Sequence, residues 1–300
     1  MKRVLVTDPI SSAGLEELAR RGLEVVDLAA EKEPSTAGSA ATAIDRLVAE
    51  LGTAHGWIVR SGTQVDAELL NRADNLQVVG RAGVGVDNID MEVATLRGIV
   101  VMNTPDSGTT SAAEHTLAVM LALARNVQPG HGQVLAGQWD RQGLQGTELR
   151  GKTLGIIGLG RIGRLVMGFA RSLGMQLLGY DPYARPGLLD ADEIILVELE
   201  ELLARSDFVS LHVPLNDETH HLIDARRLGQ MKPTARLINC ARGGIVDEDA
   251  LATALGEGTI AGAAVDVFVS EPLPTDHPLL KAPHVLLTPH LGASTKEAQE

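Results

Sequence analysis

The stretch TLGIIGLGRIGRLVMGFA, residues 153–170, decides the fold of this chain. It opens with an apolar run typical of a buried strand and continues with helical periodicity. Between the two, Gly158, Gly160 and Gly163 have the spacing GxGxxG. The first glycine permits a tight turn, the second lets a pyrophosphate approach the backbone, and the third allows close packing of helix on strand. Because a helix N-terminus attracts negative charge, the stretch predicts a dinucleotide-binding unit.

An acidic residue follows this unit at the distance expected for a ribose contact. Asp181 ends the next apolar run, LLGYD, about 20 residues after Gly158, which is the usual separation. A carboxylate there accepts hydrogen bonds from ribose hydroxyls and repels a 2′-phosphate, so NAD is favoured over NADP. These features together predict a Rossmann NAD-binding domain.

A second nucleotide-like pattern is misleading. GTELRGKT, residues 146–153, matches the phosphate-loop pattern GxxxxGK[ST]. A working phosphate loop needs a strand before it and a helix after it. Here a polar segment precedes the match and a strand-like run follows, so we expect no triphosphate site.

Strand-like and helix-like segments alternate along nearly the whole chain. Strands are expected over 3–8, 23–28, 56–61, 75–83 and 99–105, and helices over 15–22, 43–51, 66–73, 91–98 and 111–127, the last with Ser111 as its N-cap. A Gly-rich segment then runs to about Arg150 before the alternation restarts. Two such series indicate two α/β domains with doubly wound parallel sheets.

Proline and polar residues interrupt the pattern near Asn103–Pro105 and Thr288–His290, where we expect the chain to cross between the domains. One domain would then hold residues 1–103 and 290–300, and the other residues 104–289. The last residues, STKEAQE, have the pattern of a helix that has only just begun, so we expect the sequence to continue in a longer protein.

The composition excludes several classes of partner. The net charge of −13 argues against nucleic acid or an anionic membrane as the main partner. The single cysteine, Cys240, cannot form an internal disulfide, which fits a reducing compartment. No stretch approaches the roughly 18 uninterrupted apolar residues of a membrane helix. We therefore expect a cytoplasmic globular protein.

The stretch RLINCARGGIVDEDAL, residues 236–251, places an arginine between an expected buried strand and an expected helix. Leu237 and Ile238 predict the end of a buried strand, and Asp247 predicts the start of a helix. Between them, Arg242 lies in a glycine-flanked turn, and arginine is rarely buried without a partner. We therefore expect an anion to bind this guanidinium.

Five motifs occur in order: VGRAGVGVDNID (79–90), GLGRIG (158–163), NCARGGIVDEDAL (239–251), VDVFVSEP (265–272) and LLTPHLGAST (286–295). Together they closely resemble the D-2-hydroxyacid dehydrogenase family, and the resemblance runs from the first strand to the last residue. It implies a flavodoxin-like substrate domain, a Rossmann NAD-binding domain, and hydride transfer between NAD and a 2-hydroxy acid.

The resemblance also implies three catalytic residues. Arg242 would bind the substrate carboxylate and the developing carbonyl through its bidentate fork. His290 would be the general base for the hydroxyl proton, and the acid in the reverse direction. Glu271 would orient the imidazole and favour its charged form.

The remaining site residues are likewise carried over by resemblance. Besides the glycines and Asp181, cofactor contacts are expected from Arg161, Ile162, His212, Val213, Pro214, Thr219, Cys240, Ala241, Asp266 and Gly292, with Asp266 at the nicotinamide carboxamide. Substrate contacts are expected from Arg60, Ser61, Arg81, Val84, Gly85 and Arg141. Arg141 would reach across from a neighbouring subunit of a homodimer or homotetramer.

Neither histidine pattern outside this set predicts a metal site. His220 and His221 are neighbours in an extended segment and point apart. His115 lies within the long helix, where we expect a structural role.

The arginine trio of residues 60, 81 and 141 favours a phosphorylated 2-hydroxy acid as the small-molecule substrate. One alternative is a family member for unphosphorylated acids, such as a glyoxylate/hydroxypyruvate reductase or a D-lactate dehydrogenase. Another is an NAD-sensing, corepressor-like binding protein, because fold alone does not define activity. Turnover with NAD and a small acid would separate these.

Overall fold

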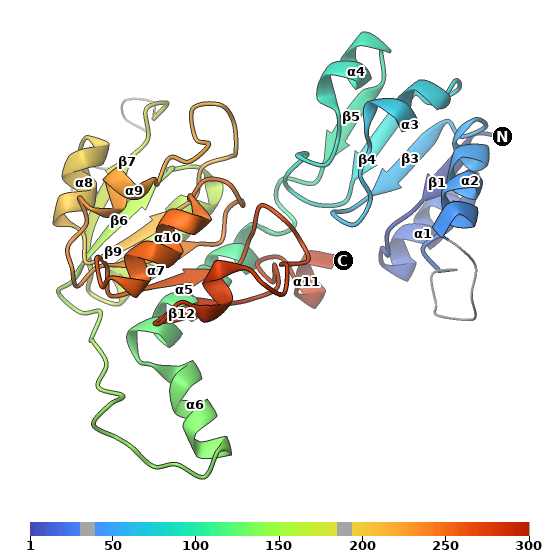
Figure 1. The fold of residues 1–300 in the computed structure, drawn as a ribbon. Coiled ribbons are helices and arrows are strands. Elements are labelled where there is room, and N and C mark those ends of the chain that lie inside the picture. The colour runs from blue at the N-terminus through green and yellow to red at the C-terminus, as the bar shows by residue number, and fades with distance from the viewer. Residues whose placement is uncertain (31–39, 185–193, 300) are drawn as a thin grey trace. The chain divides into compact units, whose positions relative to one another are not determined.

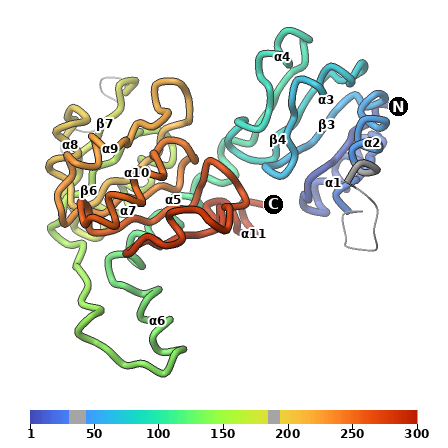
Figure 2. Tube along the Cα trace, in the orientation of Figure 1, coloured from blue at the N-terminus to red at the C-terminus, as the bar shows by residue number. Residues whose placement is uncertain are grey.

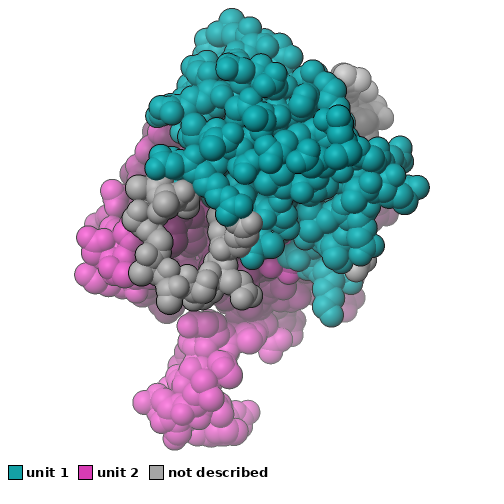
Figure 3. Space-filling model, turned by 90° about the vertical axis from the view of Figure 1, so that its right-hand side faces the viewer, with its two compact units in different colours: residues 1–108, 295–300 teal, residues 109–294 magenta. Residues whose placement is uncertain are grey.

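The computed structural model describes residues 1–30, 40–184 and 194–299 (Figure 1). The chain divides into two compact units (Figure 3): unit 1 holds residues 1–108 and 295–300, and unit 2 holds residues 109–294. The two boundaries between the units, at residues 108/109 and 294/295, fall a few residues beyond the crossing points expected from the sequence. No helix of the described residues is both long and apolar enough to cross a membrane.

Unit 1 is a five-stranded parallel sheet with helices. Its strands are β1 (Arg3–Val6), β2 (Glu24–Asp27), β3 (Gly56–Val59), β4 (Val78–Arg81) and β5 (Val100–Asn103), and its helices are α1 (Ser12–Arg20), α2 (Ala40–Leu51), α3 (Ala67–Arg72), α4 (Met91–Leu96) and α11 (Lys296–Gln299). The spatial order is β2-β1-β3-β4-β5, which is the flavodoxin-like order. Leu5, Trp57 and Val79 are fully buried in its core.

Side-chain caps begin three of these helices. The side chains of Ser11, Asp66 and Asp90 accept hydrogen bonds from backbone N–H groups in the first turns of α1, α3 and α4. Such caps satisfy donors that have no partner within the helix. The periodicity of the sequence predicted these helices, although α1 begins at Ser12, three residues before its expected start.

Unit 2 is a seven-stranded parallel sheet. Its strands are β6 (Thr153–Ile157), β7 (Gln176–Tyr180), β8 (Ile195–Leu196), β9 (Phe208–Leu211), β10 (Arg236–Asn239), β11 (Gly262–Val265) and β12 (Val285–Leu287). Its helices are α5 (Thr109–Ala124), α6 (Val127–Leu135), α7 (Arg161–Ser172), α8 (Leu199–Arg205), α9 (Ala225–Leu228), α10 (Glu248–Gly256) and the 3-10 helix η1 (Pro278–Lys281). The order β12-β11-β10-β9-β6-β7-β8 contains the six-strand Rossmann order with one extra edge strand.

Both faces of this sheet are covered, so alternate side chains of one strand enter different cores. Ile157 packs in a cluster with Leu202 of α8 and Leu251 of α10. Its neighbour Ile156 packs in the other cluster with residues of α5 and α7, among them Val166. The apolar run before the glycines is therefore continuous because neither face of the strand meets water.

Several expectations from the sequence are wrong or incomplete. His220 and His221 do not point apart in an extended segment, because they lie in a turn and their rings stack with centroids 4.0 Å apart. Helix α5 begins at Thr109, so Ser111 is a buried residue of its first turn and not its N-cap. The Gly-rich segment after α5 contains a helix, α6, which projects from the sheet of unit 2 in Figures 1 and 2. Pro129 is tolerated there because the first turn of a helix has no N–H partners to lose. The phosphate-loop match at 146–153 leads into β6, without the required helix.

Candidate active site

The carboxyl ends of the unit 2 strands carry most of the predicted site. Gly158 follows β6, Asp181 follows β7, and His212 follows β9. Cys240 follows β10, and Asp266 follows β11. All these strands are parallel, so their carboxyl ends meet at one edge of the sheet, where ligands bind in open α/β folds.

The three glycines have three different geometries. Gly158 has a φ of 94°, and a Cβ there would lie 2.7 Å from the carbonyl carbon of His212. A Cβ on Gly163 would lie 2.1 Å from the Gly158 oxygen, so helix α7 packs against the turn too closely for a side chain. A Cβ on Gly160 would meet nothing within 4 Å. The open space at Gly160, at the N-terminus of α7, fits the approach of a pyrophosphate.

The Asp181 carboxylate faces this turn. Its Oδ2 atom accepts a hydrogen bond of 2.8 Å from the Leu159 N–H, and its Oδ1 atom accepts one of 2.9 Å from Tyr183. A carboxylate oxygen accepts more than one hydrogen bond, so both oxygens retain capacity for ribose hydroxyls. Arg161 and Ile162 begin α7 directly after the turn.

The loop after β9 is closed by its own side chains. The Thr219 hydroxyl donates to the Pro214 carbonyl at 2.6 Å, which brings these two residues together. Val213 approaches the turn, because its Cγ1 would lie 2.9 Å from a Cβ on Gly158. The His212 Nε2 atom lies 2.8 Å from the Ser210 hydroxyl. Burial lowers the pKa of His212 to about 4, so its ring is neutral at pH 7.

The Arg242 turn is held by a residue that the sequence reading missed. The buried Asn239 side chain accepts from the Ala241 N–H at 3.1 Å and donates to the Arg242 carbonyl at 2.9 Å. A Cβ on Gly243 would lie 2.1 Å from backbone atoms of Phe268, so the turn packs directly on the segment after β11. An asparagine at a strand end before a turn is the signal that could have identified this role.

The segment after β11 and the turn after β12 bring Glu271 and His290 together. His290 Nδ1 lies 2.7 Å from Glu271 Oε2, and the other carboxylate oxygen accepts from the Phe268 N–H at 3.0 Å. Both side chains are partly exposed, at 41% for His290 and 36% for Glu271. The pair therefore combines a fixed carboxylate with an imidazole that is open to solvent.

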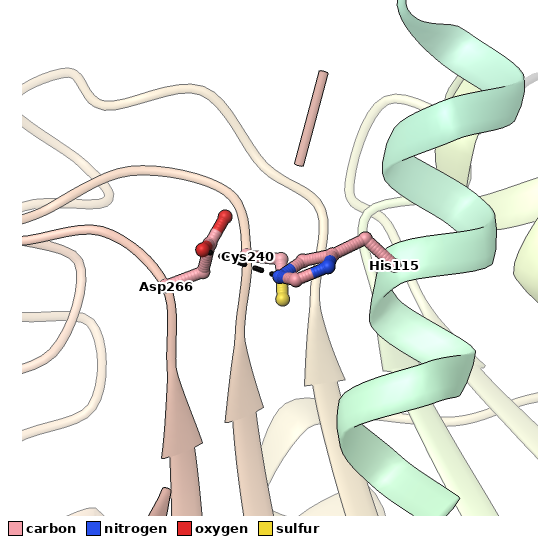
Figure 4. Close-up of side chains that lie close together, drawn as sticks. All are labelled: His115, Cys240 and Asp266. Carbon is pink, nitrogen blue, oxygen red and sulfur yellow. Dashed lines mark ion pairs between the residues drawn. The ribbon is translucent and has the colours of Figure 1, made fainter. Parts of the chain in front are cut away.

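The Asp266 carboxylate is buried, and both of its oxygens accept hydrogen bonds. It accepts hydrogen bonds from the Thr288 hydroxyl at 2.6 Å, from the Leu291 N–H at 2.8 Å and from the Gly292 N–H at 2.9 Å. His115 Nε2 lies 3.2 Å from its Oδ1 atom (Figure 4). Burial alone would raise the pKa of Asp266, but the hydrogen bonds of His115, Thr288 and Leu291 outweigh it and lower the pKa.

The unit 1 residues lie at the ends of two adjacent strands. Arg60 follows β3, and Arg81 ends β4 as the register partner of Val59. The buried Asp8 carboxylate accepts from the Arg60 N–H at 2.6 Å and shapes the turn that holds Ser61. The Arg81 guanidinium lies over Gly83, where a Cβ would be 1.4 Å from its Nη1 atom. Val84 and Gly85 continue this glycine turn, with the Val84 carbonyl accepting from Asn103.

Arg141 is the remaining residue of the predicted substrate set. It is exposed in the segment between α6 and β6. Its predicted role depends on a second subunit.

The sheet order, the glycine turn and Asp181 together define a dinucleotide-binding protein with two α/β units. The family model described as "D-isomer specific 2-hydroxyacid dehydrogenase, NAD binding domain" matches residues 117–292, all within unit 2. This chain belongs to that family, and the prediction of an NAD-binding domain is confirmed.

Individual relatives agree with this assignment. The chain is 45% identical over 301 residues to D-3-phosphoglycerate dehydrogenase of Methanocaldococcus jannaschii, covering 100% of this chain and 55% of that protein. The chain thus spans about half the length of the curated relatives it matches.

Two solved structures are similar over almost the whole chain. A protein from Thermus thermophilus has a TM-score of 0.86 at 38% identity, covering 99% of this chain and 92% of that one. A D-lactate dehydrogenase of Aquifex aeolicus, complexed with NAD and lactic acid, has a TM-score of 0.84 at 30% identity, covering 99% and 90%.

Proposed function

We propose that this chain catalyses the NAD-dependent oxidation of D-3-phosphoglycerate to 3-phosphohydroxypyruvate, a reaction that would feed serine biosynthesis in the cytoplasm. The similarity to D-3-phosphoglycerate dehydrogenase over 100% of the chain carries the proposal. The sequence motifs themselves resemble that member of the family most. The Glu271–His290 pair at 2.7 Å supports an acid–base step.

Each of the three catalytic residues has a separate role in the proposed reaction. Arg242 holds the substrate carboxylate through its guanidinium fork. Because His290 Nδ1 is engaged with Glu271, its Nε2 atom is the one that takes the hydroxyl proton. Glu271 stabilises the imidazolium that results. When bound in the cradle of Gly160 and Asp181, NAD would supply the acceptor of the hydride.

Recognition of the phosphate is assigned to unit 1. Arg60 and Arg81 come from adjacent strand ends in a chain whose net charge is −13. Two guanidinium groups there suit a doubly charged phosphate. The turn of Val84 and Gly85 offers backbone N–H groups to the substrate carboxylate.

The proposal is tested by NADH oxidation with 3-phosphohydroxypyruvate beside hydroxypyruvate, glyoxylate and pyruvate at equal concentration. We expect a strong preference for the phosphorylated keto acid, and we expect Arg60→Gln to reduce that preference. Arg72→Gln is the matched control, because Arg72 is an exposed unit 1 arginine paired with Glu68. Preference for an unphosphorylated acid in the wild type would overturn the substrate assignment.

The first alternative is a dehydrogenase for an unphosphorylated acid. The TM-score of 0.84 with the D-lactate dehydrogenase shows how similar the folds of these enzymes are. In that case the same assay gives turnover with pyruvate, glyoxylate or hydroxypyruvate. NAD binding without turnover of any of the four acids would instead favour a binding protein of the corepressor kind.

We further propose that unit 2 forms a homodimer, or part of a homotetramer, through α6 and the segment after it. Val134, Leu135 and Trp139 are exposed there by 58%, 75% and 80%. Apolar exposure of this extent on one projecting segment is typical of an interface. A monomer at micromolar concentration by light scattering would contradict both the dimer and the role of Arg141.

A further inference from the structure

His115, Cys240 and Asp266 form a cluster in which His115 has no role so far (Figure 4). The imidazole comes from α5, the thiol follows β10, and the carboxylate follows β11. One nitrogen, sulfur or oxygen atom of each lies within 4.8 Å of the others. Their proximity raises two possibilities, a metal site or a hydrogen-bonded support.

The surroundings of the three side chains favour a hydrogen-bonded support over a metal site. Both Asp266 oxygens already accept hydrogen bonds from the segment after β12. Burial and the charge of Asp266 raise the pKa of Cys240 to about 12, which keeps the sulfur a neutral thiol. The carboxylate is thus already held by hydrogen bonds from its own unit, and the thiol beside it is uncharged. We therefore treat the cluster as a hydrogen-bonded support.

The hydrogen-bond chemistry assigns the proton on His115. An ionised carboxylate only accepts, so the Nε2 atom, 3.2 Å from Asp266 Oδ1, is the donor. The same Nε2 lies 3.3 Å from the Thr288 hydroxyl, which itself donates to Oδ1. The His115 side chain is 17% exposed and Asp266 is 1% exposed. Hydrogen bonds to a charged group are strongest when water is excluded in this way.

The Asp266 carboxylate in turn holds the segment that carries His290. It binds Thr288, Leu291 and Gly292, and the His290 N–H donates to the Asp266 carbonyl at 2.8 Å. His290 itself has a φ of 54°, which is costly for a residue other than glycine and needs support from its surroundings. Gly292 completes the packing, because a Cβ there would lie 3.3 Å from Asp266 Oδ2 and 3.9 Å from Ala112 of α5.

We infer that His115 is a positioning residue: through Asp266 it holds the turn of residues 288–292 in the conformation that presents His290. The structural part of this inference is independent of activity. Its catalytic consequence rests on the proposed function. The helix α5, which contributes no other predicted site residue, thereby becomes part of the acid–base machinery.

Hydrogen exchange of the Leu291 and Gly292 amides tests the structural part, since both donate to Asp266. We expect these amides to exchange about tenfold faster in His115→Leu, because one hydrogen bond to a charged group is lost. His115→Gln retains an N–H donor and should exchange at nearly the wild-type rate. Glu114→Gln, an exposed neighbour on α5, is the control and should be unchanged. Unchanged exchange in His115→Leu would overturn the inference.

Turnover tests the catalytic part with the same variants. We expect the kcat of His115→Leu to fall about tenfold and that of His115→Gln to recover most of the loss. Faster amide exchange with an unchanged kcat in His115→Leu would overturn the catalytic consequence. If the wild type itself turns over none of the acids, the proposed function fails, while amide exchange still decides the role of His115.

Discussion

The Nδ1 atom of His290 lies 2.7 Å from the Oε2 atom of Glu271, and the second oxygen of the same carboxylate is tied to the Phe268 backbone N–H at 3.0 Å. The Glu271 carboxylate is therefore anchored to its own loop, after β11, while it orients the His290 imidazole in the loop after β12. This relationship sets the orientation of the proposed acid–base residue and directs its Nε2 atom away from Glu271.

Replacing His290 by asparagine should abolish turnover without disturbing NAD binding. Asparagine tolerates the left-handed backbone of this position but transfers no proton, so kcat should fall by about 10²–10⁴-fold. Calorimetry should give an unchanged NAD affinity. His284→Asn is the matched control, because His284 has the same φ of 54° at the other end of β12. Parallel loss of NAD binding and turnover in His290→Asn would mean that the residue is structural.

Asp181 should determine the choice between NAD and NADP. In Asp181→Asn the amide oxygen still accepts from the Leu159 N–H, but the charge that repels a 2′-phosphate is gone. We expect the ratio of kcat/KM for NAD to that for NADP to fall about tenfold, since an unscreened like-charge contact costs more than about 1 kcal/mol. In Asp181→Ala the ratio of kcat/KM for NAD to that for NADP should fall in the same way. An unchanged ratio in both variants would remove this role from Asp181.

Gly160 should be required for cofactor binding but not for folding. A Cβ at this position meets no protein atom within 4 Å, yet it would stand where the pyrophosphate approaches. Gly160→Ala should therefore weaken NAD binding about tenfold, by the steric cost at the turn, and leave the melting temperature within about 2 °C. The control is Gly168→Ala on α7, where a Cβ also meets nothing within 4 Å. Equal NAD affinity in both variants would contradict the assignment of the cradle.

His212 should make the stability of unit 2 depend on pH in the mildly acidic range. Burial lowers its pKa to about 4, so below about pH 6.5 the unfolded chain binds a proton that the folded chain does not. The free energy of unfolding therefore keeps its full value above about pH 6.5. It falls by about 3 kcal/mol on account of His212 as the pH falls toward 4. Urea unfolding at pH 7 and pH 4 should show that His212→Gln loses less stability than the wild type over this interval. Equal losses would show that His212 does not titrate as its burial requires.

The fold was largely readable from the sequence because local signals agreed with one another. Apolar runs of strand length and helical periodicity predicted both α/β units, and GxGxxG with Asp181 predicted the cofactor-binding unit. The exceptions have local causes. Pro129 and the adjacent glycines obscured α6, and Ser111 resembled a cap although the helix begins two residues earlier.

By itself, the sequence determined which residue types stand at the strand ends, since strand alternation and glycine spacing depend only on neighbours along the chain. The pairing of Glu271 with His290 was expected only from the family resemblance, and the contacts themselves were decided by the tertiary structure. Glu271 and His290 are joined because strands β11 and β12 lie side by side, and His115 reaches Asp266 because α5 packs against β11, a strand far from it in sequence. Such contacts depend on the packing of a whole sheet, and no local pattern records them.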